Sequence, residues 1–326
     1  MYEIPLIMLI FASRNYIYDS STCQQTLTCV CTGMHFCSQQ KSRIMMKAKK
    51  VLFITQDINP YVENKEMAEL GRRIPQALQE SGCEIRTFMP KWGCINERRS
   101  QLHEVIRLSG MNLIIDDTDH LLIIKVASIP SARMQVYFID NDDYFQKRNE
   151  SCDDDGEEYE DNGERAIFYA RGVLETVKKL RWVPDIIHCQ GWMSSIVPLY
   201  VKTAYREEPS FRDSRVIYTP GGDALQKPMD GEFVNSLLFK DVTQDTVAGL
   251  PDKVFENDLN RLALDYSDGL LLTQGCRDAA LGDYAAEHDL DVLQLDKPVK
   301  GADGAAFVDF FNNVWSKGKD EEVEES

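Results

Sequence analysis

The sequence predicts an α/β fold: a Rossmann-like, mostly parallel sheet with helices on both faces. Short apolar runs that are typical of buried strands occur at residues 51–55, 185–189 and 215–219. Segments with helical periodicity separate these runs, so strands and helices alternate along the chain. Parallel strands need crossover helices, and those helices cover the two faces of the sheet. We therefore expect an open sheet buried on both sides.

The first strand–loop–helix–strand unit spans residues 50–93. Pro60 and Asn64 mark the loop after the first strand, and Ser81-Gly82 ends the helix that follows. The apolar positions of this helix recur every three or four residues: Met67, Leu70, Ile74, Ala77 and Leu78. A second strand is expected at residues 84–90. The loop lies at the carboxyl end of the first strand, where open α/β sheets bind ligands.

A β-rich insertion follows this unit. Four strand-like runs, with turns at Gly110 and residues 116–119, are expected at 105–108, 111–115, 121–129 and 134–139. The run at 121–129 is almost wholly apolar, so we expect a central strand there.

The second half of the chain continues the alternation. Asp161 is expected to be the N-cap of a helix, with Glu164 completing a capping box. Further helices are expected at residues 192–205, 277–288 and 305–315, with strands at 270–273 and 291–295. Residues 221–250 carry Pro, Gly and polar side chains and are expected to form a loop or lid.

Composition excludes some classes of function. The chain has 326 residues, 43% of them apolar, and a formal net charge of −17. Such acidity disfavours a nucleic-acid partner, since phosphates would be repelled. Nine cysteines are dispersed without metal spacing, which fits a reducing cytoplasm and predicts no metal or cofactor. The apolar run at residues 4–12 is far shorter than the roughly 20 residues of a membrane helix, so no membrane contact is expected.

Three segments are expected. Residues 1–45 read as an unstructured leader or a misassigned start, because Met45-Met46-Lys47 has the character of a natural protein start. Residues 46–316 would form the Rossmann-like domain. Residues 317–326 are strongly acidic and are expected to be a disordered, solvated tail.

Several motifs share the spacing of one known family. Pro60, Pro75, Arg86, Pro90 and Gly93 follow it in the first unit. The run Trp182-x-Pro184-Asp185-x-x-His188 with a following Trp192, and Asp161-Asn162-x-x-Arg165 at a helix start, follow it later. Over residues 49–219 the chain resembles the glycogen and starch synthases, α-glucan glucosyltransferases that use ADP-glucose.

The resemblance implies half of a GT-B fold, which consists of two Rossmann-like domains with the active site between them. This chain would be the N-terminal domain, and its ligands would be ADP-glucose and α-glucan, with no cofactor. A second domain, which holds most nucleotide-sugar contacts in the family, would come from a protein partner. The positions that the resemblance places in the cleft are Glu63, Asn64, Asp161, Asn162, His188, Gln190, Trp192 and Met193.

Two of these regions depart from the family pattern. The family loop reads Lys-Thr-Gly-Gly-Leu, and this chain has Glu63-Asn64-Lys65-Glu66-Met67. The family motif His-Asp-Trp-His ends on a histidine that donates a hydrogen bond to the donor sugar, and Met193 occupies that position. A thioether donates nothing. No catalytic residue is therefore assigned, and capping alone would explain Asp161, as a structural role would explain His188.

Two hypotheses remain open. Transfer from ADP-glucose must stabilise a departing diphosphate, which needs cations and open backbone N–H groups. A carboxylate at Glu63 repels that anion, so the residues favour a degenerate member: a glucan-binding, regulatory or structural protein of glycogen metabolism. The alternative is a glucosyltransferase that elongates α-1,4-glucan, alone or with a partner that supplies the second domain.

Overall fold

The computed structural model describes residues 48, 50–63, 65–222, 225–276, 278 and 280–324, with side chains of the last helix described to residue 317. These residues belong to one compact unit, residues 43–326. The leader or misassigned start expected at residues 1–45 lies outside the described residues, as does Asn64.

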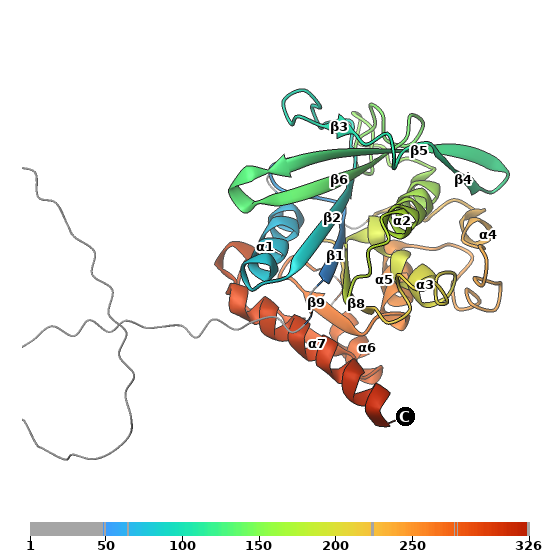
Figure 1. Cartoon of the computed structure of the whole chain (residues 1–326). Coiled ribbons are helices and arrows are strands. Elements are labelled where there is room, and N and C mark those ends of the chain that lie inside the picture. The colour runs from blue at the N-terminus through green and yellow to red at the C-terminus, as the bar shows by residue number, and fades with distance from the viewer. Residues whose placement is uncertain are drawn as a thin grey trace, which may run out of the picture. The chain divides into compact units, whose positions relative to one another are not determined.

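A ten-stranded mixed sheet forms the centre of this unit (Figure 1). Its order is β10-β9-β8-β7-β1-β2-β6-β5-β3, with β4 paired to β5. Strands β1, β2 and β6 to β10 run parallel, and the β3–β5, β4–β5 and β5–β6 pairs are antiparallel. The bounds are β1 Lys50–Thr55, β2 Glu84–Pro90, β3 His103–Glu104, β4 Met111–Ile115, β5 Thr118–Ile129, β6 Met134–Asp140, β7 Ile186–Gln190, β8 Arg215–Thr219, β9 Gly269–Leu272 and β10 Asp291–Gln294.

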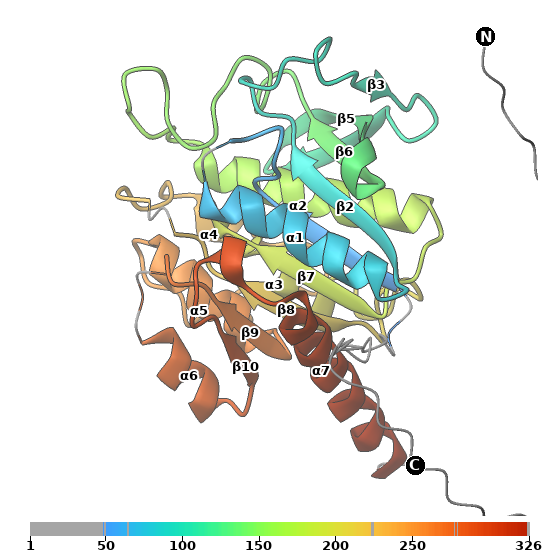
Figure 2. The same cartoon turned by 90° about the vertical axis from the view of Figure 1, so that its left-hand side faces the viewer.

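Helices cover both faces of the central strands, as Figures 1 and 2 show: α1 and α7 lie on one side, and α2, α3 and α5 on the other. Their bounds are α1 Glu66–Glu80, α2 Asn162–Lys179, α3 Val197–Lys202, α4 Phe233–Ser236, α5 Glu256–Asp265, α6 Leu281–Glu287 and α7 Gly304–Glu324. Three 3-10 turns are η1 Pro130–Ala132, η2 Trp192–Ser194 and η3 Val299–Gly301. The predicted α/β class, with a mostly parallel sheet, is confirmed.

Strand β1 shows why its sequence is a continuous apolar run. Successive side chains of a strand point to opposite faces, and both faces of β1 are covered. Val51 and Phe53 pack in the core beneath α1 and α7, whereas Leu52 and Ile54 pack in the core on the α2 side. All four side chains are buried.

The antiparallel insertion differs from the expectation in two ways. β5 lies beside the sheet edge, between β6 and the two-residue β3, so the prediction of a central strand was wrong. Its apolar residues are not all buried, and Leu121 is 48% exposed. Residues 106–108 form a turn rather than a strand, because the N–H groups of Leu108 and Ser109 bond back to the Val105 carbonyl, at 2.8 and 3.0 Å.

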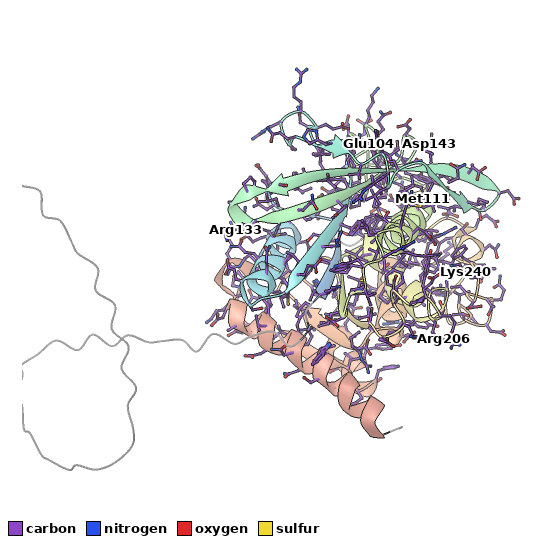
Figure 3. The ribbon with its side chains drawn as sticks, in the orientation of Figure 1. Glu104, Met111, Arg133, Asp143, Arg206 and Lys240 are labelled. Carbon is purple, nitrogen blue, oxygen red and sulfur yellow. The ribbon has the colours of Figure 1, made fainter. Side chains whose placement is uncertain are left out.

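The β5–β6 hairpin reaches over to α1. Arg133, with a left-handed φ of 53°, turns the chain at the hairpin end labelled in Figure 3. Gln79 of α1 donates from Nε2 to the Arg133 carbonyl at 3.2 Å, and Arg72 donates from Nη2 to Ser131 Oγ at 2.9 Å. The insertion is therefore anchored on α1.

Several helix boundaries differ from the expectation. The helix expected at 192–205 divides into η2 and α3, with Pro198 in the first turn of α3. Helix α6 begins at Leu281, later than the expected start at residue 277. Helix α7 continues to Glu324, so most of the segment 317–326, which was expected to be a disordered tail, is helical. Residues 225–255 form a packed loop around α4, with Phe233 and Leu237 buried.

The start of α2 corrects the predicted capping box. Asp161 occupies the N-cap position, but its side chain makes no capping hydrogen bond. Its carboxylate instead accepts two hydrogen bonds from Arg148, at 2.6 and 2.5 Å. Glu164 accepts a hydrogen bond from the Tyr144 hydroxyl at 2.9 Å. Both carboxylates therefore bind side chains of the loop before α2, Arg148 and Tyr144, instead of capping the helix.

Candidate functional site

The sheet has a topological switch point between β1 and β7. From β1 the chain builds β2 and β6 on one side, then returns to place β7 on the other side. Thr55 and Gln190 pair at the carboxyl ends of these two strands. Ligands of open α/β sheets bind outside the carboxyl ends at such a point, so this edge is the candidate site.

Side chains of the chain itself fill the crevice at this point. Trp92 Nε1 donates to the Gln56 carbonyl at 2.8 Å, and Gln190 Nε2 donates to the Met67 carbonyl at 2.7 Å. Gly191 has φ 83° and packs so closely on Gln56 that an added Cβ would lie 2.2 Å from Gln56 Oε1. Gln56, Trp92 and Gln190 are buried, so the crevice is closed to a ligand in this conformation.

The cation of the β1–α1 loop is already paired. Lys65 Nζ makes a short hydrogen-bonded ion pair with Glu150 Oε2, and it lies 4.0 Å from Asp57 Oδ2. The Asp57 side chain is fully buried, while that of Lys65 is one-third exposed. Two carboxylates thus surround this ammonium group and offset its charge.

An open cavity of about 540 Å³ lies at the same edge. Carboxylates outnumber ammonium groups in its lining, which consists of Asn59, Glu63, Lys65, Glu66, Glu69, Pro298, Val299 and Lys300. Glu66 and Glu69 belong to the first turn of α1, where they complement the helix dipole. The backbone N–H groups that could cradle a phosphate are therefore already balanced by carboxylates of the chain.

The C-terminal wall of this cavity is fastened to α1. Arg73 donates from Nη1 to the Lys300 carbonyl at 2.5 Å and from Nη2 to the Ala302 carbonyl at 2.9 Å. These bonds hold η3 beside the first half of α1.

His188 lies in the core beneath the edge. Its ring is 1% exposed and packs edge-on against Phe53 and Phe311, with centroids 5.5 and 5.6 Å away. Its Nε2 lies 2.8 Å from Thr219 Oγ1. Burial lowers the pKa of His188 to about 3, so the ring is neutral near pH 7. This position suits a structural role.

Trp192 and Met193 are also enclosed. Both belong to η2, where Trp192 is 3% exposed and Met193 is fully buried. Neither side chain reaches the open cavity in this conformation. Of the positions expected in the cleft, Glu63 alone of the described ones is exposed and lines the cavity.

Asn162 and Arg165 hold the loop that carries Glu150. Arg165 is fully buried and donates to the carbonyls of Tyr144 at 3.0 Å and of Asn149 and Glu150 at 2.7 Å. It also donates to Asn162 Oδ1 at 2.7 Å. Burial lowers the pKa of Arg165 to about 10, and the neighbouring Arg148 adds to this shift. The guanidinium stays charged at neutral pH and fixes Glu150 opposite Lys65.

Sequence reasoning missed Gln56, Asp57 and Glu150. Gln56 and Asp57 directly follow β1, so their place at the carboxyl edge could have been read from the strand boundary. Glu150 lies 85 residues from Lys65 in the sequence, and no local pattern signals their pairing.

These features define an α/β domain with a mostly parallel sheet and a candidate ligand site at the carboxyl edge of its switch point. A family model, the starch synthase catalytic domain, matches residues 50–270, more than half of the chain. The chain therefore belongs to the starch synthase catalytic-domain family, as the sequence resemblance predicted.

Curated relatives agree. A glycogen synthase of Chlorobium luteolum is 41% identical over 172 residues, covering 52% of this chain and 35% of that protein. A glycogen synthase of Chlorobaculum parvum is 33% identical over 222 residues, covering 67% of this chain and 44% of that protein. The chain thus spans less than half the length of these relatives.

A solved structure supports the fold. The catalytic domain of starch synthase IV from Arabidopsis thaliana, bound to ADP and acarbose, aligns with a TM-score of 0.59 at 16% identity. The alignment covers 77% of this chain and 51% of that one. At this identity the likeness concerns the fold alone.

Two kinds of feature are absent from the described residues. No described helix is long and apolar enough to cross a membrane. In the same part of the chain, His, Cys, Asp and Glu side chains form no group of three or more that could hold a metal ion.

Proposed function

We propose that this chain is a synthase-family domain that binds α-glucan but does not transfer glucose from ADP-glucose by itself. Glucan binding is inferred from the family match, and the observation that carries the absence of transfer is the state of Lys65, the single cation of residues 56–65. Transfer requires cations that stabilise the departing diphosphate. Lys65 is paired with Glu150 and lies near Asp57, so its charge is offset before any substrate arrives.

The surrounding carboxylates strengthen this interpretation. Glu63, Glu66 and Glu69 line the cavity that a diphosphate would enter. Two like charges about 4 Å apart repel by about 4 kcal/mol at an effective dielectric constant near 20. Nucleotide binding at this edge therefore works against the local field unless further cations are supplied.

Met193 removes a second contribution, a hydrogen bond to the donor sugar. The family resemblance places at this position a histidine that donates to the donor sugar, whereas a thioether donates no hydrogen bond. The full burial of Met193 also keeps it from any ligand in the cavity.

Activity could be restored by a partner. A second polypeptide that presents Lys and Arg side chains would be attracted to the carboxylates of this edge and would supply the missing cations. We place such an assembly in the cytoplasm because the described cysteines, Cys83, Cys94, Cys152, Cys189 and Cys276, are all free.

The alternative is a working glucosyltransferase that elongates α-1,4-glucan. The match of the family model over residues 50–270 favours it. Under this alternative, substrate binding would have to displace Glu150 from Lys65 and open the crevice at Gln56.

The discriminating experiment incubates the purified chain with labelled ADP-glucose and glycogen, with heat-killed protein as control. We expect no incorporation, together with retardation in a gel that contains glycogen. Incorporation that is lost on heating and survives Glu63→Ala would establish the enzyme. Absence of retardation would refute glucan binding.

A gain-of-function series sharpens this test. The triple variant Glu63→Lys, Lys65→Gly, Glu66→Gly restores the charge and glycines of the family loop, and Arg107→Lys is a charge-neutral control elsewhere. We expect the triple variant to bind ADP at least 10-fold more tightly than the parent in titration calorimetry. Equal ADP affinities would contradict the proposed role of the loop.

A further inference from the structure

A second cavity, of about 600 Å³, lies on the other side of Glu63. It is bounded by the β1–α1 loop, α1, the loop after β2 and the end of the β5–β6 hairpin. Its lining includes Tyr61, Arg72, Asn96, Arg99, Ser100 and Ser131. Its volume falls within the roughly 300–1,000 Å³ that small-molecule sites occupy.

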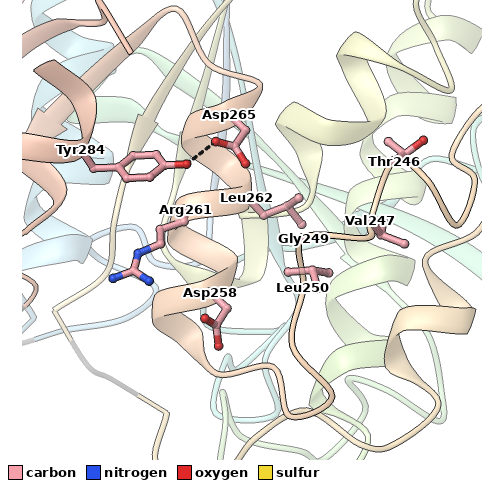
Figure 4. Close-up of a pocket in the computed structure, with 9 residues that line it drawn as sticks. All are labelled: Thr246, Val247, Gly249, Leu250, Asp258, Arg261, Leu262, Asp265 and Tyr284. Atoms are coloured by element: carbon pink, nitrogen blue, oxygen red, sulfur yellow. Dashed lines mark hydrogen bonds between the residues drawn. The ribbon is translucent and has the colours of Figure 1, made fainter. Parts of the chain in front are cut away.

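The charge of this lining is opposite to that of the chain. Two guanidinium groups, Arg72 and Arg99, face one carboxylate, Glu63, in a protein of formal charge −17. Two other cavities of the protein are acidic. The carboxyl-edge cavity has three carboxylates against two ammonium groups. The groove over α5 in Figure 4 has Asp258 and Asp265 against Arg261.

Neither guanidinium group is held in an ion pair with another described residue. In the part of the chain that the structure describes, no carboxylate lies within 4.0 Å of Arg72 or Arg99. The bond from Arg72 Nη2 to Ser131 Oγ, at 2.9 Å, holds one guanidinium against the hairpin. The backbone N–H of Arg99 donates to Asn96 Oδ1 at 2.9 Å, which holds the turn that carries this side chain. Both cations therefore retain donors for a ligand.

Tyr61 adds an independent observation. Its ring is fixed edge-on against Phe138, with centroids 4.9 Å apart. Its hydroxyl is buried and has no hydrogen-bond partner among the described residues. Burial raises the pKa of Tyr61 to about 12, so the hydroxyl remains a donor. A buried hydroxyl without a partner costs about 1–3 kcal/mol, so Tyr61 forms an apolar wall of the cavity with its ring and keeps its hydroxyl out of reach of a ligand.

We propose that this cavity binds a small phosphomonoester, with its phosphate on Arg72 and Arg99 and its polar body on Asn96 and Ser100. A phosphate dianion matches two guanidinium groups, each of which can bind it through paired N–H donors. The neutral amide and hydroxyl groups suit the hydroxyls of a phosphorylated sugar. The same charge would also attract free inorganic phosphate, so the test must separate these two sources.

The site goes beyond the proposed glucan binding, because it shares only Glu63 with the carboxyl-edge cavity. Glu63 opposes a phosphate in both cavities, but here it is one carboxylate against two guanidinium groups. Since residues 60–63 line the new cavity, a bound phosphomonoester would restrain the β1–α1 loop.

The test is titration calorimetry of the full chain with inorganic phosphate, a hexose 6-phosphate and the free hexose at low ionic strength. We expect both phosphates to bind, the free hexose not to bind, and affinity to fall as sodium chloride is added. Tighter binding of the hexose phosphate would identify a phosphorylated sugar, and equal binding would identify free phosphate. Binding of neither phosphate at millimolar concentration would overturn the proposal.

Variants locate the site. The double change Arg72→Gln, Arg99→Gln should weaken phosphate binding at least 10-fold, whereas Arg107→Gln, another exposed arginine, should leave it unchanged. Tyr61→Phe should leave binding unchanged and the melting temperature equal or higher, because it deletes a buried hydroxyl without a partner. Equal losses in the double variant and in Arg107→Gln would show non-specific attraction and refute the assignment. All the substituted arginines are exposed or half-buried, and equal melting temperatures would confirm that the variants fold.

Discussion

Replacing Gly191 with alanine tests whether the switch-point crevice is closed in solution. Gly191 follows β7 and has φ 83° and ψ 166°, a backbone region that is essentially restricted to glycine. An added Cβ would lie 2.2 Å from Gln56 Oε1 and 2.5 Å from its Cδ. The substitution therefore acts in two ways, through the backbone and through the Gln56 amide.

The two contributions have separate magnitudes. Holding a non-glycine residue in this region costs about 1–3 kcal/mol. Forcing a buried side chain out of its place costs about 1–3 kcal/mol more. We therefore expect Gly191→Ala to lower the free energy of unfolding by about 2–6 kcal/mol, the sum of these two ranges.

A double-mutant cycle separates them. Gln56→Ala removes the atoms that the new methyl group would meet, so the double variant should lose only the backbone contribution relative to Gln56→Ala. Urea denaturation followed by circular dichroism measures all four proteins. We expect a coupling energy of about 1–3 kcal/mol between the two sites.

Two results would refute this reasoning. A loss below about 1 kcal/mol in Gly191→Ala would mean that the backbone is not held in this region. Strict additivity of the two changes would mean that Gln56 does not fill the crevice, and an open crevice would weaken the case against nucleotide binding.

Three further predictions concern the frame of the site. The pKa of His188 is about 3 in the folded protein and its ordinary value is 6.5, so unfolding takes up a proton below pH 6.5. The contribution of the neutral ring to the free energy of unfolding should be fully present above pH 6.5. It should be lost as the pH falls towards 3, by up to about 1.4 kcal/mol per pH unit. His188→Gln should flatten that part of the urea-midpoint profile, and an unchanged slope would contradict the assignment. Arg165→Met leaves one buried and two partly buried carbonyls without this donor, so it should cost about 1–3 kcal/mol for each group left unsatisfied and raise hydrogen exchange in residues 141–161. Normal protection there would count against the role of Arg165 in holding this loop. Phe311→Ala should lower the free energy of unfolding by about 3–5 kcal/mol, because the fully buried ring packs α7 against Phe53 of β1. Thermal or urea unfolding measures this loss, and a value under about 1 kcal/mol would show that α7 is not docked.

The departures from the sequence predictions have a common cause. Residues 121–129 are apolar enough for a central strand, yet β5 lies near the edge with Leu121 exposed. Hydrophobicity alone does not reveal which neighbour covers a strand. Likewise Asp161 and Glu164 have capping-box spacing, but Arg148 and Tyr144 compete for their carboxylates.

The amino-acid sequence alone determined the strands of the parallel region, the helix α1 and the family. Burial on both faces requires continuous apolar runs, and those runs are visible without any structure. Its local charges also showed an acidic loop, Glu63 to Glu66, where the family resemblance places Lys and glycines.

The tertiary structure alone decided what that loop contacts. Lys65 meets Glu150 across 85 positions of sequence, Gln56 packs on Gly191, and Arg72 meets Ser131 across 59 positions. Such contacts depend on how the crossovers bring distant segments to one sheet edge, and single-sequence periodicity carries no information about them. The sequence therefore indicated an acidic loop where the family resemblance places Lys and glycines, whereas the three-dimensional fold revealed its paired lysine, its closed crevice and the neighbouring arginine cavity.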